Sequence, residues 1–214
     1  MGIPLQNSLR KRSQAQVALL QDEVVDLLYS AYPQITFHGG TCIWRCYGGN
    51  RFSEDLDFCL QKKQFSEERL RKALSSRSLG LDKLKMTENL LFSKVSSDET
   101  QVRLEISFSA TKKPAVRTYE KADGSFMDVL ALPAEELLLE KIAAYRSRRL
   151  IRDIYDVYHL SRLAKETDAV ERQMRHLLES PPKPLDEKNL KAIVYSGAVP
   201  TFAQMVEALK GRYA

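Results

Sequence analysis

The sequence predicts an α+β fold in which a mixed-sheet N-terminal domain with flanking helices, residues 1–131, precedes a helical-bundle C-terminal domain, residues 132–214. Two observations predict this fold class. Apolar residues alternate with polar ones in several short segments before Pro133, which is the pattern of half-buried strands. After Pro133, apolar residues recur at helical spacing, and proline itself suits the first turn of a helix.

The N-terminal domain is expected to begin with a helix, because apolar residues between Ser8 and Ala31 recur at steps of three and four. Further helices are expected at 41–46 and 66–77. Strands are expected at 35–38, 56–60, 90–96, 101–108 and 126–130. The C-terminal helices are expected at 134–147, 151–165, 168–179, 187–195 and 201–211, with a proline-rich break at 180–184.

Composition excludes several classes of protein. The chain has 214 residues, of which 43% are hydrophobic, so disordered and collagen-like sequences are excluded. No apolar run approaches the ~20 residues that span a bilayer, so no membrane partner is expected. The cysteines Cys42, Cys46 and Cys59 are expected to be free thiols in a reducing cytoplasm, and with scattered histidines they suggest no zinc site. The net charge of +5 is compatible with phosphate-bearing partners.

A pair of carboxylates is the main candidate for chemistry. Asp55 and Asp57 stand two apart in an expected strand, so both side chains project from one face. Adjacent carboxylates repel each other unless a cation neutralises them, and hard oxygen ligands suit Mg²⁺. Gly39 and Gly40 would let backbone N–H groups approach a phosphate, and Thr41 adds a hydroxyl. This pattern indicates a site for a metal-bound triphosphate.

Glu105 is the candidate third carboxylate for two-metal phosphoryl chemistry. It lies mid-strand on the polar face of residues 101–108, where a neighbouring strand could place it beside the two aspartates. The alternative is a surface glutamate paired with Arg103 or a lysine. The chain has no GxxxxGK[ST], HExxH or GxSxG run, which excludes the P-loop NTPases and the common zinc-protease and serine-hydrolase classes.

Two segments resemble a known family. Gly39-Gly40-Thr41 followed by Arg-Phe-Ser-Glu-Asp-Leu-Asp-Phe at 51–58 resembles the signature of the DNA polymerase β-like nucleotidyltransferases, and more closely that of the AbiEii-type toxins. Glu140-Lys141-Ile-Ala-Ala and Arg-Asp-Ile-Tyr-Asp at 152–156 also match. The resemblance covers about residues 35–165. Threonine stands at position 41 where many nucleotidyltransferases have serine, which keeps the hydroxyl.

The resemblance implies a cytoplasmic toxin that transfers NMP from an NTP to tRNA or another RNA acceptor, with Mg²⁺ or Mn²⁺, and that a cognate antitoxin neutralises. It also implies that Lys141 and Asp153 take part in catalysis. Arg51, Ser53 and Asp156 are expected to help bind the nucleotide, with Lys141 as a point charge near the triphosphate.

A basic segment follows Lys141. Four arginines, with no acidic residue between them up to position 152, are expected to contact RNA or nucleotide phosphates: Arg146, Arg148, Arg149 and Arg152. The alternative is a solvated junction in which Asp153 and Asp156 hold Arg149 and Arg152 in place.

The motifs leave both the acceptor and the general base open. The acceptor could be a small molecule or a protein side chain, because the glycine and aspartate motifs alone do not separate these from RNA. The fold could also serve as a non-catalytic binding module. In a catalytic site, the acceptor's proton could go to Asp57 or to Glu105.

Overall fold

The computed structural model describes residues 4–98, 100–109 and 113–213. It consists of two compact units. The first unit contains Met1–Cys46 and Phe52–Leu132, and the second contains Tyr47–Arg51 and Pro133–Ala214. The short segment Tyr47–Arg51 therefore lies within the N-terminal half of the sequence but belongs to the second unit.

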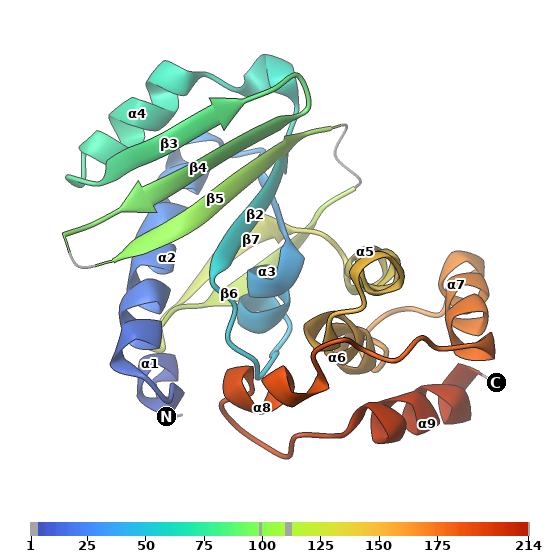
Figure 1. Cartoon of the computed structure of the whole chain (residues 1–214). Coiled ribbons are helices and arrows are strands. Elements are labelled where there is room, and N and C mark those ends of the chain that lie inside the picture. Colours follow the sequence, from blue (N-terminus) through green and yellow to red (C-terminus); the bar gives the residue numbers. More distant parts are fainter. Residues whose placement is uncertain (1–3, 99, 110–112, 214) are drawn as a thin grey trace. The chain divides into compact units, whose positions relative to one another are not determined.

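In the described part of the chain, seven strands form one mixed sheet in the order β3-β4-β5-β2-β1-β7-β6 (Figure 1). Their bounds are β1 Thr36–His38, β2 Asp55–Leu60, β3 Gly80–Met86, β4 Leu90–Ser96, β5 Gln101–Phe108, β6 Ala115–Glu120 and β7 Phe126–Ala131. The pairs β2–β5 and β1–β7 are parallel, and the other neighbours are antiparallel. The predicted α+β class is confirmed.

The helices of the first unit are α1 Leu5–Ser8, α2 Arg12–Ala31, α3 Gly39–Cys46 and α4 Glu67–Ser75, with a 3-10 turn at Lys62–Gln64. Helix α2 packs against α4 and β5, while α3 packs against β1, β2 and β6. The core includes the alternating apolar residues of the central strands, among them Leu56, Phe58, Leu104 and Ile106, all fully buried. The polar residues between them stand on the opposite face of the sheet.

The sequence patterns do not predict strands β3 and β6. Both stand at the edges of the sheet, and most of their residues are exposed or half-exposed. An edge strand buries little on either face, so its sequence need not alternate. The helix predicted over 187–195 is shorter and partly 3-10: a 3-10 turn, Glu187–Asn189, is followed by the short α8, Leu190–Ile193.

The second unit is otherwise built of α5 Ala134–Arg148, α6 Ile151–Leu160, α7 Asp168–Glu179 and α9 Phe202–Tyr213. Helix α5 packs against α6 and α7, and α9 packs against α6 and α7. Among the residues that the structure describes, no helix combines the length and apolar character needed to cross a membrane.

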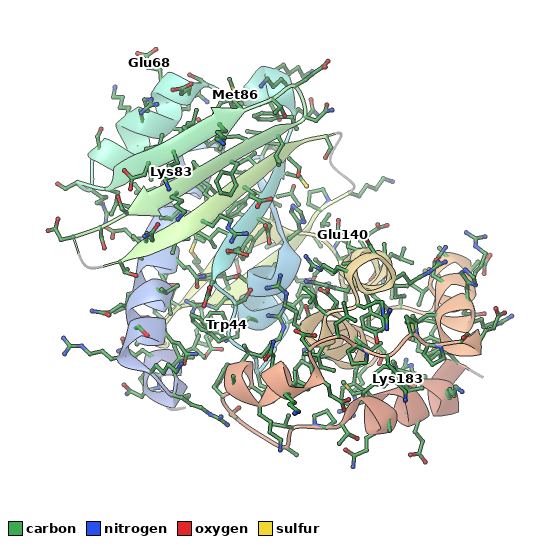
Figure 2. The ribbon with its side chains drawn as sticks, in the orientation of Figure 1. Trp44, Glu68, Lys83, Met86, Glu140 and Lys183 are labelled. Atoms are coloured by element: carbon green, nitrogen blue, oxygen red, sulfur yellow. The ribbon has the colours of Figure 1, made fainter. Side chains whose placement is uncertain are left out.

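A buried polar network joins two helices of the first unit to strand β6. The carboxylate of Asp22 pairs with Arg45 and accepts hydrogen bonds from Tyr119 Oη (2.8 Å) and the Ala122 amide (2.7 Å). The Arg45 guanidinium lies 4.8 Å from the ring centroids of both Trp44 (labelled in Figure 2) and Tyr119. Burial raises the pKa of Asp22, although Arg45 opposes the shift.

Replacing Tyr119 with phenylalanine is expected to lower the free energy of unfolding by about 1.5–3 kcal/mol, because a hydrogen bond to a buried charged group is lost. Urea unfolding measures the change. A double-mutant cycle with Asp22→Asn isolates the pair, and Tyr119→Phe should cost clearly less once the carboxylate is gone. Equal losses in both backgrounds would contradict the assignment.

Candidate active site

The chain turns directly from β1 into α3 at Gly39, beside Asp57. Gly39 has φ +76°, and a Cβ atom built there would lie 2.1 Å from Asp57 Oδ2 and 2.8 Å from Asp57 Cβ. A side chain at position 39 would therefore collide with Asp57 and also strain the backbone. Only glycine allows the first turn of α3 to lie so close to this carboxylate, and the free N–H groups of a helix N-terminus favour negative charge.

The three candidate carboxylates lie on one face of two adjacent strands. Strands β2 and β5 are parallel, and their register places Asp55 beside Arg103 and Asp57 beside Glu105. All three carboxylate residues are half-buried, whereas the alternate residues of β2 are buried. The structure therefore brings together Asp55, Asp57 and Glu105 near Gly39.

On this face of the sheet, Glu105 lies close to the negative charges of Asp57 and Asp55. Burial raises the pKa of Glu105, and the charge of Asp57 raises it further. Arg103 acts in the opposite direction: its Nη1 lies 4.0 Å from Glu105 Oε1, and its Nε lies 3.4 Å from Asp55 Oδ1. The sequence analysis names Arg103 only as the alternative partner of Glu105, and the structure places it near both Glu105 and Asp55 on the same face of β5.

The donor chemistry of this face fits Mg²⁺. Carboxylates are hard oxygen ligands, and the charges of Asp57 and Asp55, which raise the pKa of Glu105, would be relieved by a cation. Within the described ranges, no three His, Cys, Asp or Glu side chains are gathered closely enough to hold one ion by themselves. Mg²⁺ usually takes one or two protein carboxylates together with substrate phosphates, so two aspartates would be enough protein ligands; metal binding by Asp55 and Asp57 stays a prediction.

Further predicted residues of the first unit hold the site's backbone. The Thr41 hydroxyl is buried and donates to the Asp55 carbonyl oxygen at 2.5 Å, which ties α3 to the start of β2. The Gln21 amide donates to the carbonyl oxygens of Ser53 (3.0 Å) and Glu54 (3.1 Å). Contacts of Thr41 and Ser53 with a nucleotide stay predictions.

In the second unit, the structure gathers five of the remaining predicted site residues in one cluster. Arg51 donates from Nε and Nη2 to the two carboxylate oxygens of Asp156, at 2.5 and 2.6 Å. Lys141 Nζ lies 2.9 Å from Asp156 and 3.7 Å from Asp153. Arg148 makes two bonds to Asp153, at 2.6 and 2.7 Å. We call these five residues the ion cluster.

The ion cluster is buried apart from Arg148. The side chains of Asp153 and Asp156 are 0% and 1% exposed, and Arg51 and Lys141 are also buried. Burial alone would raise the pKa of Asp156, but Arg51 and Lys141 outweigh it and hold the pKa below its usual value. Asp156 is therefore a buried anion whose charge depends on both cations; its role toward a nucleotide, like those of Lys141 and Asp153, stays a prediction.

The remaining predicted RNA contacts surround the junction of α5 and α6. Arg146 contacts His176 Nε2 at 2.6 Å, and Arg149 donates to the Lys183 carbonyl oxygen at 2.8 and 3.0 Å. Arg146 is exposed, and Arg149 and Arg152 are half-exposed; their contacts with RNA stay predictions.

Comparison with known families identifies the class. A family model described as "Nucleotidyl transferase AbiEii toxin, Type IV TA system" matches residues 26–211. The chain belongs to the AbiEii nucleotidyltransferase toxin family. This AbiEii protein is thus a nucleotidyltransferase toxin, for which the family implies an NTP substrate and a cognate antitoxin.

Solved structures share the fold of this AbiEii protein at low sequence identity. JHP933 from Helicobacter pylori superposes with a TM-score of 0.67 at 19% identity, over 90% of this chain and 88% of that one. The nucleotidyltransferase toxin MenT4 from Mycobacterium tuberculosis gives 0.64 at 18% identity, over 98% and 86%. The antibiotic-resistance factor ANT(2'')-Ia gives 0.52 at 12% identity, over 78% and 93%. None of the curated proteins matches the sequence.

Replacing Gly39 with alanine is expected to lower nucleotidyl transfer by the AbiEii protein about 100-fold, because displacement of a catalytic group by about 1 Å has an effect of that size. The new methyl group would collide with Asp57 Oδ2. The matched control is Gly124→Ala, where φ is +86° but the nearest atom to an added Cβ, in Pro4, is 3.5 Å away. Equal activity of the two variants in a transfer assay would contradict the close approach.

Proposed function

We propose that this protein transfers an NMP from an NTP to an RNA acceptor, with tRNA as the expected substrate, in a reaction that requires Mg²⁺ or Mn²⁺. The observation that carries the proposal is the position of Gly39 against Asp57, with Asp55 and Glu105 on the same face of the sheet. A phosphate chain at this point would meet N–H groups of a helix N-terminus on one side and carboxylates suited to a metal on the other.

The roles follow from the chemistry of each group. Asp55 and Asp57 would hold the metal, and the backbone amides at Gly39 and Gly40 would bind the β- and γ-phosphates. When bound, the metal neutralises the phosphate charge and polarises the α-phosphate. The acceptor hydroxyl oxygen forms a bond to the α-phosphorus, and the bond from that phosphorus to the pyrophosphate oxygen breaks. The acceptor's proton goes to Asp57 or Glu105, and pyrophosphate leaves with the bonding electrons.

Charge supports an RNA acceptor. The chain carries a net charge of +5, and Arg146, Arg148 and Arg152 are exposed or half-exposed where α5 ends and α6 begins. Accessible arginines bind phosphate backbones through paired N–H donors. A family resemblance to enzymes that modify tRNA points to the same acceptor.

The test incubates the purified protein with total RNA, a tRNA fraction, or an aminoglycoside mixture, and with each NTP labelled at the α- or the γ-phosphate. We expect RNA of tRNA size to acquire the α-label and not the γ-label, with Mg²⁺ or Mn²⁺ present. EDTA should abolish the labelling, and excess Mg²⁺ should restore it. Label confined to the aminoglycosides or to the protein, or labelling of RNA that persists in EDTA, would overturn the proposal.

A further inference from the structure

A pocket of about 650 Å³ lies within the second unit. Its walls come from Gly48 and Asn50, from the C-terminal half of α6 with Arg162 just after it, and from residues 198–200 and 204. Pockets that bind small molecules have volumes of roughly 300–1,000 Å³. The pocket contains none of the carboxylates of the first unit and none of the ion cluster.

The wall of this pocket is held by hydrogen bonds between distant parts of the sequence. Tyr155 Oη donates to Asn50 Oδ1, and Asn50 Nδ2 donates to the Ser196 carbonyl oxygen at 2.6 Å. His159 Nε2 lies 2.8 Å from the Tyr47 carbonyl oxygen. Because a carbonyl only accepts, Nε2 carries the proton, and Nδ1 is the acceptor of the neutral ring. These hydrogen bonds hold the wall of the pocket together.

One side of the pocket carries a cation held against an aromatic ring. The Arg162 guanidinium lies 4.5 Å from the centroid of the Tyr158 ring, and its Nη2 donates to the Tyr158 hydroxyl. A guanidinium held in this way offers its planar face to a base and its remaining N–H donors to a phosphate. Gln204 Oε1 accepts from Thr201 N at 2.9 Å, which leaves its Nε2 as the donor toward a ligand.

The charge of the lining selects the ligand. None of the described residues that line this pocket is acidic, and Arg162 is its permanently charged side chain. A second hollow in the same unit also has an arginine near a tyrosine, Arg212 at 5.6 Å from the Tyr213 ring, but it is lined by Glu166 and Glu171. The first pocket therefore favours a planar ligand that bears negative charge.

We propose that this pocket binds one nucleotide, with the base stacked against Arg162 and the phosphate paired with its guanidinium. The nucleotide could belong to a single-stranded part of the RNA acceptor or could be free in solution; both present the same base and phosphate. The RNA source rests on the proposed function, whereas the pocket's affinity for a nucleotide does not.

The test measures binding of a fluorescein-labelled single-stranded oligoribonucleotide by anisotropy, and of the four nucleoside monophosphates by calorimetry, in EDTA so that no metal loads the first unit. Arg162→Ala is expected to weaken binding roughly five- to 150-fold, the range found when an aromatic side chain that stacks on one base is replaced with alanine. Arg162→Lys keeps the positive charge but lacks the planar guanidinium group, so it should restore little of the affinity. The matched control is Arg212→Ala, which should bind like the parent.

The outcomes separate this proposal from the proposed function. Parent-like binding by Arg162→Ala overturns the pocket, whether or not the parent transfers NMP to RNA. Parent-like binding by Arg162→Lys would show that the base does not stack on the planar guanidinium. Mononucleotide binding that depends on Arg162, in a protein that fails to modify RNA, supports the pocket with a free nucleotide and rejects only the RNA acceptor. Circular dichroism of each variant, all altered at exposed arginines, establishes that the fold is intact.

Discussion

Replacing Asp57 with asparagine is expected to lower nucleotidyl transfer roughly a thousandfold or more, because a metal contributes several kcal/mol of transition-state charge stabilisation and each 1.36 kcal/mol is about tenfold in rate. Asparagine keeps the size of the side chain and its fit against Gly39, but it lacks the negative charge. The initial rate of α-label incorporation at saturating NTP and Mg²⁺ measures the effect. Asp55→Asn should give a loss of similar order.

The matched control for this variant is Asp82→Asn. Asp82 is an exposed aspartate on β3, an edge strand of the same sheet, so the same chemical change there should leave the rate unchanged. Transfer by Asp57→Asn within tenfold of the parent would show that Asp57 does not hold the metal. Loss of activity in both variants would show that the substitutions disturb the sheet, so that the loss cannot be assigned to the Asp57 carboxylate.

Replacing Asp156 with alanine is expected to lower the free energy of unfolding by about 3–5 kcal/mol, because removing one partner of a buried ion pair leaves uncompensated charge. Arg51 and Lys141, both buried, would lose their shared carboxylate. Urea unfolding followed by circular dichroism measures the loss. Glu207→Ala, at an exposed position on α9, is the control and should change stability by less than about 0.5 kcal/mol.

The pH dependence of stability gives the same residue a second test. Because the pKa of Asp156 is lower in the folded chain than in the unfolded chain, its contribution is complete above the unfolded value of about 4 and is lost as pH falls through the folded value. The parent should therefore lose more stability than Asp156→Ala between pH 5 and the acid limit. Parallel curves for the two proteins would show that this carboxylate is not held ionised by the cluster.

The acidic site was predictable because it follows from a period of two. Strand β2 alternates buried and half-buried residues, and so does the second half of β5, so local patterns fixed which side chains shared a face. No local pattern predicted the parallel register that pairs Asp57 with Glu105. Nor did any predict that Gly39 lies so close to Asp57 that an added Cβ atom would collide with it. Both depend on residues far apart in the sequence.

The edge strands and the ion cluster were less predictable for different reasons. β3 and β6 bury too little to need an apolar pattern. Arg51 stands in a motif that suggests a triphosphate contact, yet its guanidinium is buried against a carboxylate 105 positions later. The local sequence cannot predict which partner such an arginine has, because the same motif is compatible with an arginine that binds a phosphate and with one that binds an aspartate.

The assignment of Tyr47–Arg51 to the second unit has a consequence for synthesis on the ribosome. Residues Tyr47–Arg51 of the second unit interrupt the first unit, and the rest of the second unit begins only at Pro133. Neither unit is therefore a continuous stretch of chain. When Arg51 emerges, its carboxylate partner is still untranslated, and it stays so until position 156 has been added. A nascent chain that stops near Leu132 lacks Asp156, the carboxylate that pairs with Arg51. The pair between Arg51 and Asp156 can therefore form only late in translation.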